Sequence, residues 1–259
     1  MQCKYFFSVL TPSYKRLEVL RRAIESVTSQ DYSEWEMIIV NDDPDSSIDI
    51  KTITDDARVR MITNDANYGA NWSRNQALSL VSSASTHVIF LDDDDYLAVG
   101  AFTALAELLR THKNTAWLVT NRAFQHGTSL TEAPQSYCAY HYGWDYLIKR
   151  TVRGDATHCI ETSVATSITF PKGIKNGEEW LYFLELSQYE SLFYVDRNIT
   201  LTDGYAEHGL NFRRRNTLDQ LRAVRTLFQD GVKRKGVRTS VVFWTYLSMR
   251  ILRAFIKRT

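Results

Sequence analysis

The stretch HVIFLDDDD, residues 87–95, places four consecutive aspartates directly after a short apolar run. The apolar run predicts a buried strand, so the aspartates would follow its carboxyl end. Adjacent carboxylates repel one another, but a divalent cation offsets that repulsion because hard cations prefer oxygen ligands and bridge to phosphate. Ligands of open α/β sheets bind at the carboxyl ends of the strands. The stretch therefore predicts a metal and phosphate site, or alternatively a solvated acidic turn before the next helix.

Short apolar runs alternate with helical patterns on both sides of this stretch. That alternation is typical of β-α-β units and predicts a mostly parallel sheet flanked by helices. The fold class is therefore α/β and Rossmann-like, and two helical stretches after residue 216 predict a C-terminal helical extension. Strands are predicted at residues 6–10, 36–40, 59–62, 87–91 and 116–120, and helices at residues 17–30, 71–81, 99–111 and 179–192.

The composition is that of an ordinary globular protein, with 259 residues of which 44% are hydrophobic and 24% charged. A net charge of +1 gives no reason to expect a nucleic-acid partner. Residues 233–259 contain 8 Lys or Arg and no Asp or Glu, whereas the rest of the chain has 23 basic and 30 acidic residues. This contrast predicts that the tail faces an anionic surface.

The cysteines and the apolar runs bear on the compartment. The three cysteines match neither a disulfide framework nor a zinc site, which favours a reducing compartment. The apolar run at residues 5–10 is too short for a signal peptide, and no run of about 18 apolar residues could span a bilayer. We therefore expect a cytoplasmic protein. Its apolar and basic tail, residues 238–258, would either lie on the anionic inner face of the cell membrane or dock on the body of the protein.

Polar segments also follow the first two predicted strands. After the first, Pro12 fixes its backbone φ before a helix, the Ser13 hydroxyl can donate a hydrogen bond, and Tyr14 can offer its ring to a base. After the second, the Asp42 carboxylate can accept from a uracil N–H or a ribose hydroxyl. An ordinary helix-entry turn and an Asx-Pro turn are the structural alternatives. Because both segments lie at the same edge of the sheet as the aspartates, we expect one shared site.

A third segment, residues 67–75, opens the predicted helix before the aspartates. Gly69 permits close backbone approach at the helix start, and Arg74 would lie within the first two turns. Arginine is the side chain suited to bidentate phosphate contacts. The segment predicts a contact to a ligand phosphate, and the alternative is a helix cap with a surface arginine.

Taken together, these segments resemble the inverting, family 2 nucleotide-sugar glycosyltransferases of the GT-A fold. The resemblance covers residues 5–110, in matching order, spacing and strand context. It rests on TPSYKR at residues 11–16, IVNDD at 39–43, NYGANWSRN at 67–75 and FLDDDD at 90–95. The family usually has Asp-Asp-Gly-Ser where this chain has Asn41-Asp42-Asp43-Pro44, so the base is a weaker inference than the fold.

For the donor, the resemblance implies a UDP-sugar. It puts Tyr14 and Asp42 at the nucleobase, and Arg74 at the phosphates or the base. The remaining donor-site residues that the motifs imply are Pro12, Ser13, Arg16, Asn67 and Gly69.

For the diphosphate and the metal, the resemblance implies roles for the aspartate run. Asp92 and Asp93 would contact the ribose and the diphosphate, and Asp94 would ligate Mn²⁺ or Mg²⁺ with Asp92 as a second ligand. His208 lies in a segment that resembles a loop closing over the diphosphate in related enzymes, so its imidazole is a further candidate ligand. The alternative for His208 is an ordinary surface histidine.

In the acceptor half, the family typically carries a Glu-Asp pair at the start of a helix, whose second acid deprotonates the acceptor hydroxyl. Glu178 and Glu179 occupy the equivalent place here, directly before Trp180. A partly buried carboxylate at a helix start gains basicity, which suits a general base. We expect Glu179 to be the base in preference to Glu178. The alternative is a helix whose first turn carries glutamates because of its dipole.

These features predict an inverting, metal-dependent hexosyltransferase. It would transfer a hexose from a UDP-sugar to a hydroxyl of a glycan or lipid-linked glycan, as in surface polysaccharide synthesis. We divide the chain into a nucleotide-sugar half at residues 1–121, an acceptor half at 122–212 and C-terminal helices at 213–259. Two alternatives remain. One is a non-catalytic relative that binds a nucleotide or glycan, and the other is a nucleotidyltransferase, although residues 1–68 lack the glycines of its phosphate loop.

Overall fold

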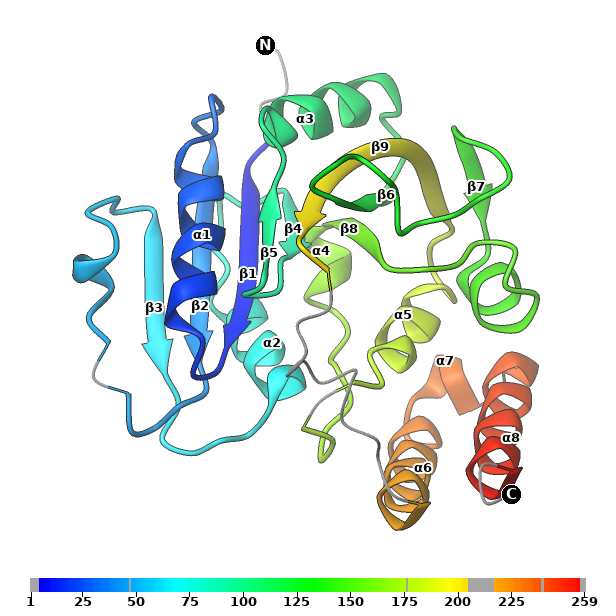
Figure 1. Cartoon of the computed structure of the whole chain (residues 1–259). Coiled ribbons are helices and arrows are strands. Elements are labelled where there is room, and N and C mark those ends of the chain that lie inside the picture. The colour runs from blue at the N-terminus through cyan, green and yellow to red at the C-terminus, as the bar shows by residue number, and fades with distance from the viewer. Residues whose placement is uncertain (1–4, 47, 176, 205–216, 239, 257–259) are drawn as a thin grey trace.

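The computed structural model describes residues 5–46, 48–175, 177–204, 217–238 and 240–256. A sheet of nine strands runs through this described part of the chain, and helices cover both of its faces (Figure 1). Its parallel part follows the order β3, β2, β1, β4. These strands span Phe7–Ser13 for β1, Trp35–Asn41 for β2, Val59–Thr63 for β3 and His87–Phe90 for β4.

The sheet continues from β4 into a mixed part. There β8 pairs antiparallel with β4 and β6, and β9 pairs parallel with β6. Two short strands, β5 and β7, pair antiparallel with β9. These strands span Asp95–Leu97 for β5, Trp117–Phe124 for β6, Cys138–Tyr140 for β7, Ala156–Glu161 for β8 and Leu192–Thr202 for β9.

The helices fall into three groups. Three follow the parallel strands, three short ones lie in the acceptor half, and three form the C-terminal extension (Figure 1). A 3-10 turn, Ile50–Thr52, precedes β3. Within the described part of the chain the helices are α1 (Leu17–Thr28), α2 (Ala70–Ser79), α3 (Ala101–Thr111), the π-helical turn η2 (Tyr142–Ile148), α4 (Thr162–Ala165), α5 (Trp180–Leu186), α6 (Thr217–Gly231), α7 (Lys235–Arg238) and α8 (Val241–Ile256).

Alternating side chains of the parallel strands form a core on each face of the sheet. In β1, Phe7 and Val9 belong to one buried cluster and Leu10 to the other. The first cluster includes the inner faces of α1 and α3, for example Ile24 and Phe102. The second includes residues of α2, α5, α6 and α8. Strands buried on both faces are near-continuous apolar runs, which is why the sequence predicts them well.

The C-terminal helix α8 docks on the body of the protein. Val242, Phe243 and Leu247 are buried, whereas Val241 and Leu252 on the same helix are exposed. Of the two alternatives for the tail, docking on the body is therefore observed, and contact with a membrane remains a prediction. Among the described residues, no helix is both long and apolar enough to cross a membrane.

Most predicted elements are observed, but one helix was predicted too long. Up to residue 124 the predicted strands and helices are present with ends shifted by four residues or fewer. The helix predicted at 179–192 instead ends at Leu186, and β9 begins at Leu192. The aromatic and β-branched residues that open β9 pair with β6 and bury Tyr194 and Val195, so strand pairing overrides the helical pattern there.

The predicted division at residue 121 falls inside strand β6. That strand runs from Trp117 to Phe124, and both of its neighbours, β8 and β9, come from the predicted acceptor half. The sheet is therefore continuous between the two predicted halves, and the division between them remains a prediction about function.

Candidate active site

The aspartate run turns sharply at the carboxyl end of β4. The backbone N–H of Asp95 donates to the carbonyl of Asp92 at 3.1 Å, which closes a turn. One carboxylate oxygen from each of Asp92, Asp94 and Asp95 lies within 4.8 Å of the others. A Mg²⁺ or Mn²⁺ ion binds oxygen ligands at about 2.0–2.2 Å, so oxygens bound to one ion lie about 3–4.5 Å apart, and a small side-chain adjustment would make this set compatible with such an ion.

The predicted ligand set is thus modified by the structure. Asp92 and Asp94 lie together as predicted, and Asp95 joins them. Asp95 was missed because the motif assigns no role to the fourth acid, although it belongs to the same run. His208 lies outside the described residues.

Three arginines from separate segments neutralise the aspartate run. Arg16, which caps α1, donates to Asp94 at 2.7 Å and to Asp93 at 3.3 Å. Arg122 of β6 donates to Asp95 at 2.7 Å, and also to Asp155 at 2.8 Å. Arg122 was not predicted, although an arginine in the middle of a mostly buried strand is a signal that it has an acidic partner.

The third of these arginines, Arg74 of α2, joins the donor motif to the acceptor motif. Its guanidinium is buried and donates to Asp92 at 2.7 Å and to Glu179 at 2.9 Å. Burial disfavours its charge, but Asp92 and Glu179 outweigh burial and raise the pKa of Arg74 above its usual range. Residues that are 105 positions apart therefore meet in one site.

The carboxylates of the run differ in their pKa. Burial raises the pKa of Asp93 to about 7 against the opposing effect of Arg16, and it raises that of Asp95 to about 7 against Arg122. Partial burial also acts on Asp92, but Arg74 and Arg122 outweigh it and lower the pKa of that group. Near neutral pH the run therefore carries less negative charge than four ionised carboxylates would.

The segment after β1 reaches the aspartates through two of its predicted residues. Ser13 is buried and its side chain hydrogen-bonds Asp93, while Arg16 forms the ion pairs described above. Pro12 lies within β1, which holds the segment in line with the sheet. Tyr14 is 43% exposed, so its ring is open to a ligand.

Asp42 shapes the loop that precedes α2. Its carboxylate accepts from the backbone N–H groups of Tyr68 and Gly69 at 2.9 and 2.6 Å, and from the Asn64 side chain at 2.8 Å. Asp42 is buried. The structure thus shows it organising this loop, a role that the motif did not indicate, whereas its predicted contact with a base remains a prediction.

The start of α2 packs directly on the loop before α5. Gly69 has a φ of +95°, and a Cβ atom there would lie 2.1 Å from the carbonyl oxygen of Lys175. The Asn71 side chain donates to the carbonyl groups of Ile174 at 3.2 Å and Gly177 at 2.9 Å. Asn67 accepts from the Lys175 side chain at 3.1 Å. These contacts fix the loop that leads to the two glutamates.

The two glutamates face different surroundings. The Glu179 side chain is 32% exposed and contacts Arg74. Glu178 is buried, accepts from the Trp180 indole N–H at 2.8 Å and pairs with Arg250 of α8. Glu179 is therefore the one of the pair that is joined to the aspartate cluster through Arg74, and its role as the base remains a prediction.

A match to a family model adds to this geometry. Residues 8–168 match the model described as Glycosyl transferase family 2. The chain belongs to glycosyl transferase family 2. The family and the GT-A fold predicted from the motifs are therefore confirmed.

Curated relatives of this family 2 chain are glycosyltransferases by name. It is 28% identical over 216 residues to the putative teichuronic acid biosynthesis glycosyltransferase TuaG of Bacillus subtilis, a match covering 80% of the chain and 77% of TuaG. It is 26% identical over 172 residues to the UDP-Glc:alpha-D-GlcNAc-diphosphoundecaprenol beta-1,3-glucosyltransferase WfgD of Escherichia coli, covering 64% of each. It is 39% identical over 111 residues to the putative colanic acid biosynthesis glycosyl transferase WcaA of E. coli K12, covering 40% of the chain but only 39% of WcaA.

Solved structures of TarS from S. aureus share the fold of this family 2 chain. A TarS fragment in complex with UDP-GlcNAc gives a TM-score of 0.68 at 16% identity and covers 96% of the chain and 71% of the fragment. A longer TarS structure gives a TM-score of 0.69 at 17% identity, covering 96% of the chain and 43% of that structure. At this identity the likeness shows the fold alone.

Proposed function

We propose that this family 2 chain is an inverting glycosyltransferase that moves a hexose from a UDP-sugar to a hydroxyl of a lipid-linked glycan in surface polysaccharide synthesis. The observation that carries the proposal is the Arg74 guanidinium, which joins Asp92 of the donor motif to Glu179 of the acceptor motif. The substrate classes are supported by the relatives, since WfgD is named for UDP-Glc and a diphosphoundecaprenol-linked sugar, and TuaG for teichuronic acid synthesis.

The donor would lie along the ends of β1, β2 and β4. The exposed ring of Tyr14 would face the base, with Asp42 accepting from it. The guanidinium groups of Arg16 and Arg74 would approach the phosphates. Pro12, Ser13, Asn67 and Gly69 would shape this part of the site through the backbone and the contacts described above.

A cation held by Asp92, Asp94 and Asp95 would supply positive charge beside the diphosphate. The arginines around the cation would also stabilise the negative charge of the diphosphate. Arg16 already lies against Asp94, and Arg74 against Asp92, so both can donate to the phosphate oxygens as negative charge develops there. His208, which we predict as a further ligand, remains a proposal.

Glu179 would act as the general base of a single displacement. The acceptor oxygen bonds to the anomeric carbon while the bond from that carbon to the nucleoside diphosphate breaks, which inverts the configuration. The hydroxyl proton passes to the Glu179 carboxylate, and the diphosphate leaves with the bonding electrons. The contact with Arg74 would hold that carboxylate in the direction of the donor.

The test compares Glu179→Gln with wild type in a transfer assay and in a UDP titration. We expect transfer to fall by about 10²–10⁴-fold, the usual contribution of a general base, with UDP affinity changed by less than about twofold. Glu132→Gln is the matched control, because Glu132 pairs with Arg153 on the exposed surface. Transfer at the wild-type rate in Glu179→Gln would remove the assignment of the base.

The cation is tested by thermal shift with a panel of UDP-sugars, with and without Mn²⁺. Wild type should be stabilised most by donor and Mn²⁺ together, since a ligand stabilises the folded state that binds it. Asp94→Asn should keep part of the donor shift and lose the Mn²⁺-dependent part. An equal Mn²⁺-dependent shift in both proteins would argue against Asp94 as a ligand.

We also propose that the protein is cytoplasmic and lies peripherally on the inner face of the cell membrane. Support comes from α8, where Val241, Trp244 and Leu252 are exposed apolar residues close to the basic stretch that begins at residue 233. Flotation with vesicles should recover wild type on anionic lipid and less of Trp244→Glu. Equal recovery of both proteins, or of neither, would contradict this proposal.

A further inference from the structure

The backbone next to Glu179 adopts a conformation that side chains normally avoid. Glu178 has a φ of +69°, and Gly177 before it has a φ of +74°. Positive φ is uncommon for residues other than glycine and persists only where surrounding contacts enforce it. The side chain of Glu178 itself makes contacts that can hold this conformation.

Those contacts lead to the C-terminal helix α8. The Glu178 carboxylate is 2% exposed and is held by the indole N–H of Trp180 and by the guanidinium of Arg250, which is 72 positions away in the sequence. The Arg250 side chain is itself 29% exposed. Removing one partner of a buried ion pair is strongly destabilising, so this pair ties the strained residue to α8.

The same helix also fixes the residue on the other side of Glu179. The rings of Phe243 and Tyr246 on α8 lie 6.3 and 4.8 Å from the Trp180 ring, between centroids. Glu179 therefore stands between two residues that α8 holds, one by an ion pair and one by ring contacts. Its own side chain is left to face Arg74.

We infer that α8 positions the general base, with Arg250 acting through Glu178 to set the direction of the Glu179 carboxylate. The inference rests on the proposed role of Glu179. Arg250 does not touch the aspartate cluster through any contact found in the described residues, so it is a positioning residue. Its loss should lower the turnover number and leave the binding of the donor unchanged.

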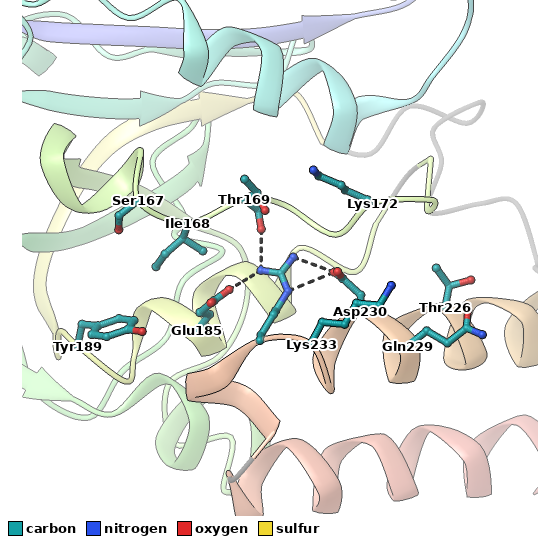
Figure 2. Close-up of a pocket in the computed structure, with 11 residues that line it drawn as sticks. Ser167, Ile168, Thr169, Lys172, Glu185, Tyr189, Thr226, Gln229, Asp230 and Lys233 are labelled. Atoms are coloured by element: carbon teal, nitrogen blue, oxygen red, sulfur yellow. Dashed lines mark hydrogen bonds and ion pairs between the residues drawn. The ribbon is translucent and has the colours of Figure 1, made fainter.

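A second arginine offers a matched control. Arg234, between α6 and α7, lines a cavity of about 660 Å³ and pairs with Glu185 of α5. It also donates to Asp230 at 2.7 Å and to the carbonyl of Thr169 at 2.8 Å, and Figure 2 shows these partners around the cavity. Arg234 thus anchors the C-terminal helices on α5 itself, whereas Arg250 anchors them on Glu178 just before α5, and Arg234 contacts no neighbour of Glu179 through these bonds.

The experiment compares Arg250→Gln, Arg250→Lys and Arg234→Gln by kcat, by KM for donor and acceptor, and by UDP titration. We expect Arg250→Gln to lower kcat at least tenfold with UDP affinity within twofold, and Arg250→Lys to recover part of that loss. Arg234→Gln should melt earlier than wild type but keep kcat within twofold. Wild-type kcat in Arg250→Gln, or an equal loss of kcat in Arg234→Gln, would overturn the inference.

Two further variants keep the test decisive. If Arg250→Gln fails to fold, Glu178→Gln removes the same ion pair and should lower kcat in the same way. The double variant should lower kcat by no more than the larger of the two single effects. Glu179→Gln separates the two proposals. Transfer at the wild-type rate in Glu179→Gln refutes the proposed function. If Glu179→Gln loses transfer while Arg250→Gln and Glu178→Gln both keep the wild-type kcat, only this inference is refuted.

Discussion

Replacement of Arg74 by methionine tests how the two halves of the site are joined. Arg74 is 8% exposed and donates to Asp92 at 2.7 Å and to Glu179 at 2.9 Å. Hydrogen bonds to charged groups contribute about 1.5–3 kcal/mol each, which gives about 3–6 kcal/mol for the pair. The Asp92 and Glu179 side chains are 47% and 32% exposed, so water replaces part of what they lose. We therefore expect Arg74→Met to lower the free energy of unfolding by about 2–4 kcal/mol.

Urea unfolding followed by tryptophan fluorescence measures this difference. For a chain of this size 1 kcal/mol corresponds to about 2–4 °C, so the melting temperature should fall by about 4–16 °C. Arg110→Met is the matched control, because Arg110 contacts Glu107 at 3.8 Å and both side chains are more than half exposed. The free energy of unfolding of Arg110→Met should stay within about 0.5 kcal/mol of wild type. The free energy of unfolding of Arg74→Lys should lie between those of wild type and Arg74→Met, since an ammonium group cannot donate in both directions as a guanidinium does.

Either of two results would refute this reasoning. If Arg74→Met unfolds within about 0.5 kcal/mol of wild type, the guanidinium does not join the two halves in solution. If Arg74→Met and Arg110→Met lose equal stability, the effect does not come from the buried contacts with Asp92 and Glu179.

Two further predictions concern the backbone and the pH dependence. Gly69→Ala should lower the free energy of unfolding in urea by about 2–4 kcal/mol, because its Cβ would meet the Lys175 carbonyl. Gly127 has the same φ of +95°, but a Cβ there would have nothing within 4 Å, so Gly127→Ala should lower that free energy by only about 1–2 kcal/mol. Equal losses would contradict the close approach at Gly69. Burial lowers the pKa of His87 to about 4 against the opposing effect of Glu161. Because the unfolded state then binds the proton more readily than the folded state, stability is lost as pH falls from about 6.5 toward 4. The difference in free energy of unfolding between wild type and His87→Gln should therefore shrink by about 2 kcal/mol between pH 7.5 and 5. A difference that does not change with pH would contradict this.

The parallel half of the fold could be predicted because each element carries its own local signal. All seven residues of β2 are buried, and its sequence WEMIIVN accordingly contains the apolar run MIIV. The mixed half gives weaker signals. Strand β8, ATHCIE, interleaves polar and apolar residues, and β5 is three residues long, so each becomes a strand only through partners that are distant in the sequence.

The site divides in the same way. Residues at strand ends, such as Asp92 and Asp94, are indicated by sequence because the strand itself fixes where they lie. Two other arginines of the site are not indicated by sequence, since Arg122 reaches Asp95 from another strand and Arg250 reaches Glu178 across 72 positions. No spacing rule connects such pairs, and only the folded chain brings them together.

The helix α2 shows where sequence reasoning could have gone further. Asn71, Arg74 and Asn75 stand at helical spacing, i, i+3 and i+4, and each contacts the segment between residues 170 and 179. A surface helix normally turns such a face to water and buries an apolar one. Here Asn71 and Arg74 are buried, because the face meets backbone carbonyls and a carboxylate that polar side chains can satisfy. A polar stripe of amides and a guanidinium on a helix that packs against a sheet therefore indicates a contact with another polar segment, and in this chain that segment carries Glu179.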